Sequence, residues 1–328
     1  MRRARQNVRM AETEGAPGGV ALPDGPPGVT WRRILPEDLE SMHALLGRIT
    51  DVDEPGRPAA RSDLEQQLAA VDPAAHTALA LRGGRAVAYG IVFPTGFAAV
   101  RLPGGVSPDA RGEGIGRRLL AWQVAQARAV RRSPDIPISA RQPSAAVATA
   151  ALLEHAGFRP DRIFLTLRRS SAPVVESPLP SDLRSVPLAP EHDEPLRVAK
   201  NRAFADHWRS RPETPDGWAQ HQLGPWLRRS LSRVAITDDG SIVGFVVTWA
   251  EAESPDEAYI ALVGTDPGWR GRGVARALLT EVLAACAADG RPAATLEVDG
   301  ASPTSADRLY ASIGFERTSE AVVHGLRA

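Results

Sequence analysis

One short pattern occurs twice in the chain, and it constrains the architecture more than any other feature. Residues 110–120 (ARGEGIGRRLL) and 269–279 (WRGRGVARALL) share an Arg-x-x-Gly-x-Gly/Ala core, and their first arginines stand 159 positions apart. The two copies align Arg111, Gly114 and Gly116 with Arg270, Gly273 and Ala275. A second landmark, a Gly-Phe pair, recurs after 157 residues at Phe158 and Phe315. Two landmarks displaced by nearly the same amount indicate a tandem duplication.

Hydrophobic periodicity predicts the same order of elements in both halves. Each half begins with a strand and a helix, continues with a strand pair, and places a further strand before the repeated pattern. A long helix, a strand, a short helix and a final strand follow. The predicted fold class is therefore α/β, with two tandem domains at 29–169 and 183–328, each a mixed, mostly antiparallel sheet flanked by helices. A Pro/Ser-rich stretch at 170–182 is the expected linker, and the Gly/Pro-rich tail 1–28 is expected to be disordered.

Size and charge narrow the functional class. The chain has 328 residues, enough for about two domains, and 39 basic residues balance 39 acidic ones. A balanced charge argues against a nucleic-acid or membrane partner, which would favour a basic surface. No apolar run approaches the ~20 residues needed to cross a bilayer, and MRRARQNVRM lacks the apolar core of a signal peptide. We therefore expect a cytoplasmic protein, monomeric or homodimeric, without a metal.

The repeated pattern is suited to binding an anion. A helix N-terminus presents unpaired N–H groups and a partial positive charge, and glycines let an anion approach the backbone itself. Arg270 and Arg272 can add charge-assisted hydrogen bonds, so a phosphate or pyrophosphate is the predicted ligand. A structural turn is the alternative interpretation of either copy. A P-loop would need Gly-Lys-Ser/Thr, and Gly112, Gly114 and Gly116 have the wrong spacing for a dinucleotide fingerprint.

The strand, the Arg-x-x-Gly-x-Gly/Ala helix start and the later LYASIGF together resemble the GNAT family of acetyl-CoA-dependent N-acetyltransferases. The resemblance covers both halves. It implies that the backbone amides from Arg270 to Ala275 hold the pyrophosphate of coenzyme A, and that the preceding strand separates from its neighbour and binds the pantetheine arm. The cofactor-binding residues so implied are Val263, Gly264, Thr265, Arg270, Gly271, Arg272, Gly273, Val274 and Ala275. The corresponding loop of the first half contains Arg111, Gly112, Gly114, Ile115 and Gly116.

Acetyl transfer from a thioester to an amine requires an acid for the leaving thiolate. In the GNAT family a tyrosine at the place of Tyr310 commonly has this role. Tyr310 is expected on a helix that opens with Ser302 as N-cap and Pro303 at its first position. In the first half Leu153 stands where Tyr310 would align. Catalysis is therefore predicted in the C-terminal half, and the first half either binds the coenzyme without turnover or serves as a scaffold.

The sequence offers several candidates for the general base and for the residues that contact the acceptor. Glu257 and Tyr259 share one face of a predicted strand, and Glu257 is the first choice of base, although Tyr259 occupies the position at which related enzymes carry an acid. Glu297 and Asp299 are rivals, and a chain of waters is another possibility. His207, Trp208 and Tyr259 are predicted to contact the acceptor. Cys286 falls on the apolar face of a helix, which favours a buried, inert thiol over a covalent acetyl-enzyme.

The sequence thus predicts an acetyl-CoA-dependent N-acetyltransferase that modifies a primary amine of a small molecule by direct attack. One alternative is a non-catalytic protein that binds or senses acyl-CoA. The tandem layout resembles mycothiol synthase and its relatives, so a second alternative is mycothiol synthesis itself, in which the cysteinyl amine of a sugar-inositol thiol precursor is acetylated.

Overall fold

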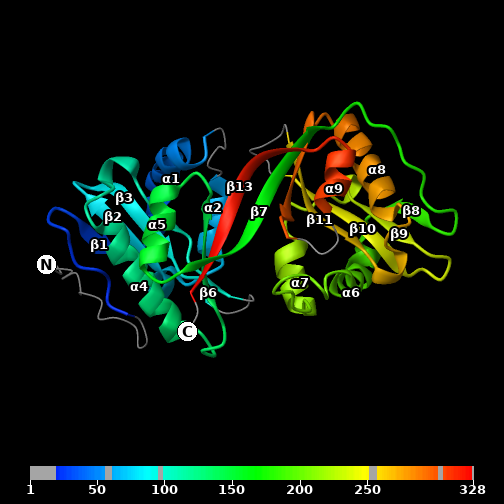
Figure 1. Cartoon of the computed structure of the whole chain (residues 1–328). Coiled ribbons are helices and arrows are strands. Elements are labelled where there is room, and N and C mark those ends of the chain that lie inside the picture. Colours follow the sequence, from blue (N-terminus) through cyan, green and yellow to red (C-terminus); the bar gives the residue numbers. More distant parts are fainter. Residues whose placement is uncertain (1–19, 56–60, 95–98, 251–256, 302–305, 327–328) are drawn as a thin grey trace, which may run out of the picture.

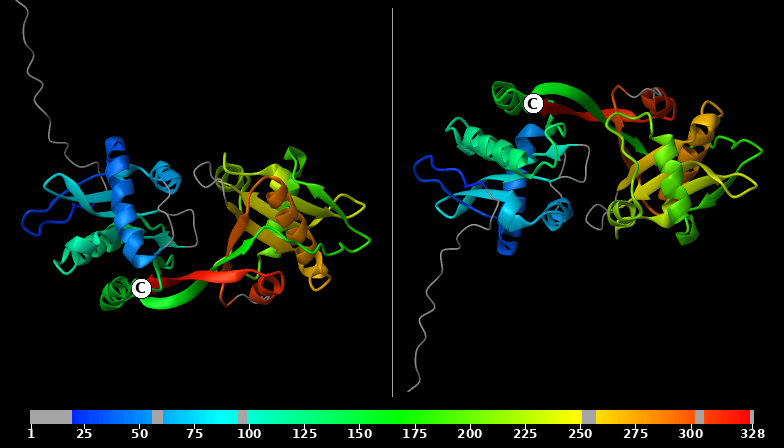
Figure 2. Two further views of the ribbon diagram at one scale, coloured as in Figure 1. Left: turned by 90° about the horizontal axis from the view of Figure 1, so that it is seen from above. Right: turned by 90° about the horizontal axis from the view of Figure 1, so that it is seen from below.

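The computed structural model describes residues 20–55, 61–94, 99–250, 257–301 and 306–326, which form two α/β lobes joined by a long two-stranded ribbon (Figures 1 and 2). The N-lobe runs from the start of the described chain to α5, and the C-lobe from β8 to α9. The ribbon consists of β7 (Arg159–Ser170) and β13 (Glu316–Leu326). Among the described residues no helix has the length and apolar character that a membrane span needs.

The N-lobe has a four-stranded sheet in the order β1-β2-β3-β5, and its strands β4 and β6 belong to the larger sheet. Its strands are β1 (Thr30–Arg32), β2 (Thr77–Arg82), β3 (Arg85–Ile91), β4 (Val100–Arg101), β5 (Gly104–Val106) and β6 (Ile138–Pro143). Its helices are η1 (Pro36–Asp38), α1 (Leu39–Asp53), α2 (Arg61–Ala69), α3 (Pro73–His76), η2 (Pro108–Ala110), α4 (Ile115–Val130) and α5 (Val147–His155). Helices α4 and α5 contribute to one hydrophobic cluster, and α1 and α2 to another.

The C-lobe repeats this plan. Its strands are β8 (Arg184–Pro187), β9 (Arg233–Ile236), β10 (Ile242–Trp249), β11 (Glu257–Thr265) and β12 (Ala293–Asp299). Its helices are η3 (Pro190–His192), α6 (Asp193–Ala203), α7 (Pro215–Gln222), η4 (Arg229–Leu231), η5 (Pro267–Trp269), α8 (Val274–Ala288) and α9 (Ala306–Ser312). Helix α8 buries Val274, Leu278 and Val282 in a cluster with α9, whereas α6 and α7 belong to a separate cluster. The helices therefore cover both faces of the sheet, because each buries an apolar stripe against it.

The two lobes exchange their last strands. The nine-stranded sheet has the order β4-β6-β13-β7-β12-β11-β10-β9-β8. Strand β7 follows the last N-lobe helix, yet its second part pairs with β12 of the C-lobe, from Phe164↔Asp299 to Ser170↔Ala293. Strand β13 returns to the N-lobe and pairs with β6, from Ala321↔Pro143 to Leu326↔Ile138. Each lobe thus completes its sheet with a strand of the other half.

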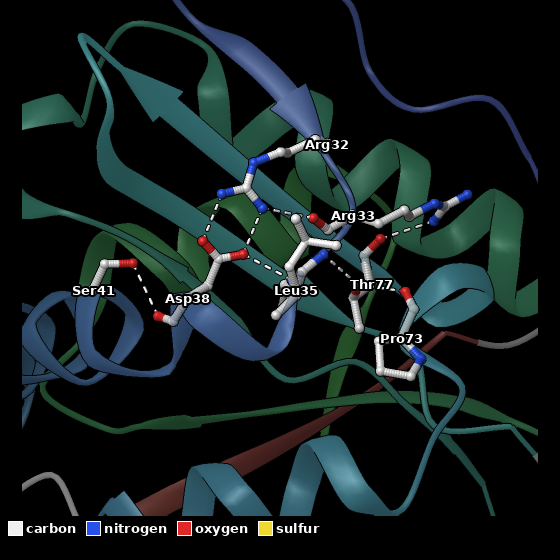
Figure 3. Close-up of polar contacts among 8 residues, drawn as sticks. Arg32, Arg33, Leu35, Asp38, Ser41, Pro73 and Thr77 are labelled. Atoms are coloured by element: carbon white, nitrogen blue, oxygen red, sulfur yellow. Dashed lines mark hydrogen bonds and ion pairs between the residues drawn. The ribbon is translucent and has the colours of Figure 1, made fainter. Parts of the chain in front are cut away.

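A network of polar contacts fixes the first turn of the N-lobe (Figure 3). Asp38 accepts hydrogen bonds from the Arg32 guanidinium at 2.5 Å and from the Leu35 amide at 2.8 Å. Thr77 accepts from the Ile34 amide at 2.9 Å and donates to the Pro73 carbonyl at 2.6 Å. These bonds satisfy backbone groups that the strand-to-helix corner leaves unpaired. In the C-lobe, His192 accepts from the Ala189 amide at 3.0 Å in the corresponding turn.

The structure confirms the predicted fold class, with largely antiparallel sheets and one parallel pair at each repeat, β4–β6 and β11–β12. Helices α2, α3 and α7 were not predicted, because they are short and interrupt the regular order of elements. Residues 20–28 were predicted to belong to a disordered tail. They instead pack along α4, where the Val20 amide donates to Gln126 at 2.9 Å and Arg118 donates to the Asp24 carbonyl at 2.9 Å.

Candidate active site

Strands β11 and β12 lie side by side for only part of their length. They pair in parallel from Glu257↔Ala293 to Ile260↔Leu296. Beyond this point β11 continues to Thr265 and pairs with β10, while β12 continues to Asp299 and pairs with β7. The two strands therefore part where Val263, Gly264 and Thr265 were predicted to separate from their neighbour. Backbone groups along this opening are available to a ligand that enters between the strands.

The N-lobe has a corresponding opening, and there the chain equivalent to β11 is divided into two strands, β4 and β5. Strand β4 pairs with β6, whereas β5, only a few residues later, pairs with β3 of the other sheet. The chain therefore changes sheets at Leu102 and Pro103, between the two strands. The opening was duplicated together with the glycine pattern.

The glycine loop has the same conformation in both halves. Gly271 and Gly273 have φ values of 75° and 83°, and Gly112 and Gly114 have 83° and 82°. This left-handed region is readily available to glycine and strained for other residues. Gly273 is the N-cap of α8. The Arg270 amide, predicted to bind the anion, instead donates to the Pro267 carbonyl at 3.5 Å. Within the described chain the N–H groups of residues 271–276 donate no hydrogen bond to protein, so they remain available to an anion at the helix N-terminus.

The first arginine of each pattern has a protein partner in the structure. Arg270 donates to both carboxylate oxygens of Asp206, at 2.7 and 3.3 Å, and to the Ala203 carbonyl at 2.8 Å. This hydrogen bonding holds the pKa of Asp206 below its ordinary value. In the N-lobe Arg111 donates to both oxygens of Asp53, at 2.9 and 2.8 Å. The guanidinium thus joins the loop to the end of the first helix of its lobe, instead of pointing at the predicted anion.

The second arginine of the C-lobe pattern lies on the surface. Arg272 donates to Asp182 at 2.7 Å and lies 4.2 Å from the centre of the Trp269 ring. Both side chains of the ion pair are about half exposed, at 43% and 51%. An exposed pair contributes roughly 0–1 kcal/mol, so Arg272 can leave Asp182 for a bound anion at little cost.

Tyr310 lies on α9 in the hydrophobic cluster that also contains Ile260 and Leu296, the last residues at which β11 and β12 pair. Its ring packs edge-on against Phe315 with 5.8 Å between the ring centres. Burial raises the pKa of Tyr310, so the phenol is protonated at neutral pH. Ser302 and Pro303, predicted to open this helix, lie outside the described residues. In the N-lobe Leu153 is buried on α5 and offers no proton.

The candidate bases are all engaged in ion pairs. Glu257 stands at the start of β11, four positions before the strands part, and accepts from Arg168 at 2.6 Å. Glu297 accepts a bidentate hydrogen bond from Arg141 of the N-lobe strand β6, and Asp299 lies 3.6 Å from Arg162. Tyr259 packs against Trp249 with 6.1 Å between ring centres, on the same strand face as Glu257.

His207 and Trp208 lie beside the opening. The His207 ring is 4.4 Å from that of Phe204, which stacks on Phe245 at 6.3 Å. A Cβ at Gly264 would lie 2.2 Å from the Phe245 ring, so this ring covers the backbone of β11 beyond the parting. Burial is the main cause that lowers the pKa of His207, against the opposing effects of the Asp206 and Asp299 carboxylates. His207 is therefore neutral at pH 7.

The Cys286 thiol lies on the buried face of α8. It is fully buried among α8 and the sheet, and burial raises its pKa to about 11. A protonated, inaccessible thiol is a poor nucleophile, in agreement with the inert role predicted for it.

Comparison with known proteins places these features in a family. Residues 198–315 match the model of the Acetyltransferase (GNAT) family. A mycothiol acetyltransferase of Thermobispora bispora is 34% identical over 230 residues, which are 67% of this chain and 73% of the relative. A mycothiol acetyltransferase of Salinispora arenicola is 33% identical over 219 residues, 65% of this chain and 69% of the relative.

Solved structures show the same fold over nearly the whole chain. A GCN5-related N-acetyltransferase from Sphaerobacter thermophilus has a TM-score of 0.78 at 24% identity and covers 92% of this chain and 97% of its own. A tandem GNAT protein from the clavulanic acid biosynthesis pathway has a TM-score of 0.70 at 16% identity, with 90% and 98% covered. The chain belongs to the GNAT family of acetyltransferases and is an acyltransferase with a tandem architecture.

Proposed function

We propose that this protein transfers the acetyl group of acetyl-CoA to a primary amine of a small molecule and that the C-lobe performs the reaction. One observation carries the proposal. Strands β11 and β12 separate after Ile260 and Leu296, and Tyr310 packs in the same cluster as these two residues. The amides of residues 271–276, which donate no hydrogen bond to described residues, follow shortly after the end of β11. The N-lobe repeats the loop and the opening but has Leu153 in place of the acid.

The residues of the C-lobe have distinct roles in this proposal. The amides of residues 271–276 bind the pyrophosphate, and the backbone of Val263, Gly264 and Thr265 binds the pantetheine arm along the opening. The neutral amine attacks the thioester carbonyl carbon and a C–N bond forms. The nitrogen then releases one proton to solvent, and the C–S bond breaks with its electron pair remaining on sulfur. Tyr310 donates its phenolic proton to that sulfur and is reprotonated from solvent. Its raised pKa keeps the proton in place until the thiolate forms.

The acceptor ammonium must lose a proton before it attacks, and two groups of the C-lobe suit that step. Glu257 is retained as the candidate predicted from sequence, although its carboxylate is neutralised by Arg168 at 2.6 Å. His207 is the second candidate, because burial favours its neutral form and the ring lies near the opening. We place the acceptor against His207, Trp208 and Tyr259.

Acetylation of the cysteinyl amine of a sugar-inositol thiol is the second candidate function, and the names of the relatives at 33–34% identity favour it. Tyr259, which stands where related enzymes carry an acid, favours a different amine. We would assay purified full-length protein with acetyl-CoA against that thiol precursor and a panel of glucosamine, spermidine, tyramine and kanamycin. Coenzyme A release with an acetylated product identifies the acceptor class. Tight binding of acetyl-CoA without any product would instead support a protein that senses the coenzyme.

A further inference from the structure

The segment that carries His207 and Trp208 is fastened at both ends. This segment, residues 203–210, is called the arm. At its start the Ala203 carbonyl and the Asp206 carboxylate accept hydrogen bonds from Arg270 of the glycine loop. At its end Arg209 donates to Asp161 at 2.6 Å, and both side chains are about four-fifths buried. Asp161 belongs to β7, so the second fastening comes from the strand that the first half contributes to the ribbon.

Arg209 has a backbone conformation that its own sequence does not favour. Its φ is +53°, and among the described residues it is the one non-glycine with a positive φ. A left-handed conformation is strained for a residue with a Cβ and persists where surrounding contacts enforce it. Two of its contacts hold the side chain in place: the ion pair with Asp161 and the stacking of the guanidinium 4.4 Å from the centre of the Trp208 ring. Gly325 of β13 leaves room for this pair, since a Cβ there would lie 3.2 Å from the Asp161 oxygen.

In this conformation the arm approaches both strands that border the opening, β11 and β12. Trp208 packs on Phe164 of β7 with 6.3 Å between ring centres and lies 5.4 Å from the Arg162 guanidinium. Phe164 pairs with Asp299, the last residue of β12, and Arg162 forms an ion pair with the same Asp299. On the other side, His207 reaches the backbone of β11 through Phe204 and Phe245. The arm therefore covers the space between the separated strands from the face opposite to Tyr310.

We propose that Arg209 and Asp161 are positioning residues for the acceptor amine and that the N-terminal half acts in the reaction by holding the arm through β7. This inference rests on the proposed function, because it assigns the acceptor to the space beneath the arm. Neither residue touches the reacting atoms. They fix the shape of the surface formed by His207 and Trp208, so they determine acceptor binding and leave coenzyme binding to the glycine loop.

The test compares full-length Asp161→Asn, Arg209→Gln and the double variant with wild-type protein. Glu320→Gln is the matched control, because Glu320 forms an ion pair with Arg317 on the same ribbon, away from the arm. Two readouts are taken: hydrogen exchange of the amides in residues 204–210, and steady-state kinetics with the best amine of the acceptor panel. Acetyl-CoA affinity is measured in parallel by calorimetry.

We expect exchange in the arm to accelerate about fivefold or more in Asp161→Asn. The acceptor KM should rise about tenfold, while kcat changes less than about threefold and acetyl-CoA affinity less than about twofold. The double variant should be no worse than either single variant, because each already breaks the pair. Arg209→Lys keeps the positive charge, so its acceptor KM should lie between those of the wild-type protein and Arg209→Gln.

Unchanged exchange in the arm would overturn the inference whatever the kinetics show. Faster exchange with an unchanged acceptor KM would show that the arm is held but does not position the acceptor, and would also overturn it. If no amine of the panel is acetylated by the wild-type protein, the proposed function fails and the inference falls with it. That outcome is distinguishable because it appears in the wild-type protein before any substitution.

Discussion

Arg270 holds Asp206 through both carboxylate oxygens, at 2.7 and 3.3 Å, and thereby connects the glycine loop to the end of α6. The same relationship exists between Arg111 and Asp53 in the N-lobe. The arginine that begins the repeated pattern therefore has a structural role in each copy. The backbone amides after it, which depend on the glycine conformations, are the groups left for an anion.

The two ion pairs differ in burial, and this predicts different effects on stability. Asp53 is 11% exposed in its side chain and Asp206 is 46% exposed. The two guanidiniums are covered to a similar extent, at 27% and 30% exposed, so the difference lies in the carboxylates. Asp53→Asn removes a largely buried charge and should lower the free energy of unfolding by about 1–3 kcal/mol. Asp206→Asn should cost about 0–1 kcal/mol. Urea unfolding of both variants measures the difference, and a larger loss in Asp206→Asn would contradict it.

Alanine substitution of the N-cap glycine in each lobe should show which of the two glycine loops the reaction depends on. Gly114 and Gly273 have φ values of 82° and 83°, so each substitution should strain its lobe by about 1–2 kcal/mol. If the C-lobe alone binds coenzyme productively, Gly273→Ala should weaken acetyl-CoA binding about tenfold or more, because the amides lose their arrangement. Gly114→Ala is the matched control and should leave turnover within about twofold. Calorimetry and steady-state assays measure the two effects, and equal losses of turnover would contradict a single catalytic lobe.

Removal of the Tyr310 hydroxyl should separate chemistry from binding. Tyr310→Phe keeps the ring that packs on Phe315, so the fold should be retained. The thiolate would then leave without a proton donor, and kcat should fall about 100-fold, the lower end of the usual contribution of a general acid. Acetyl-CoA affinity should change by less than about twofold. Turnover equal to that of the wild-type protein would remove Tyr310 from the mechanism.

The acidic side of the pH profile should identify the base. Burial lowers the pKa of His207, so its neutral form is fully present above the ordinary value near 6.5 and is lost as the pH falls through the lowered pKa. If His207 is the base, kcat/KM should decline over that range in the wild-type protein, and His207→Gln should reduce turnover and remove that limb. If Glu257 is the base instead, Glu257→Gln should reduce turnover and His207→Gln should leave the acidic limb unchanged. Rates measured from pH 4.5 to 8 in wild-type, His207→Gln and Glu257→Gln proteins decide between them.

The shared ribbon predicts that the two lobes unfold together. A fragment of residues 183–328 lacks β7, which leaves an edge of β12 unpaired along seven residue positions. It should therefore aggregate or unfold at lower urea concentration than a fragment of residues 157–328, which retains β7. The full chain should show one cooperative transition by fluorescence and circular dichroism. Two resolved transitions in the full chain would contradict this coupling of the lobes.

The sequence by itself determined the features that depend on local spacing. The recurrence of Arg-x-x-Gly-x-Gly/Ala and of Gly-Phe established the duplication, and the alternation of apolar residues established the α/β class. The glycine loop was predictable because left-handed conformations at a helix start select glycine. The difference between Tyr310 and Leu153 was also readable, since both stand at a fixed distance from the Gly-Phe pair.

Tertiary structure alone decided which groups far apart in the sequence meet. Arg270 was predicted to face an anion, and its contact with Asp206 arises because α6 ends against the loop. The exchange consists of the pairing of β7 with β12 and of β13 with β6, strands far apart in the sequence, which local periodicity cannot specify. The same exchange brings Asp161 to Arg209, and no sequence pattern marks either residue. Spacing along the chain encodes local conformation, whereas contacts between lobes depend on how complete sheets pack and pair.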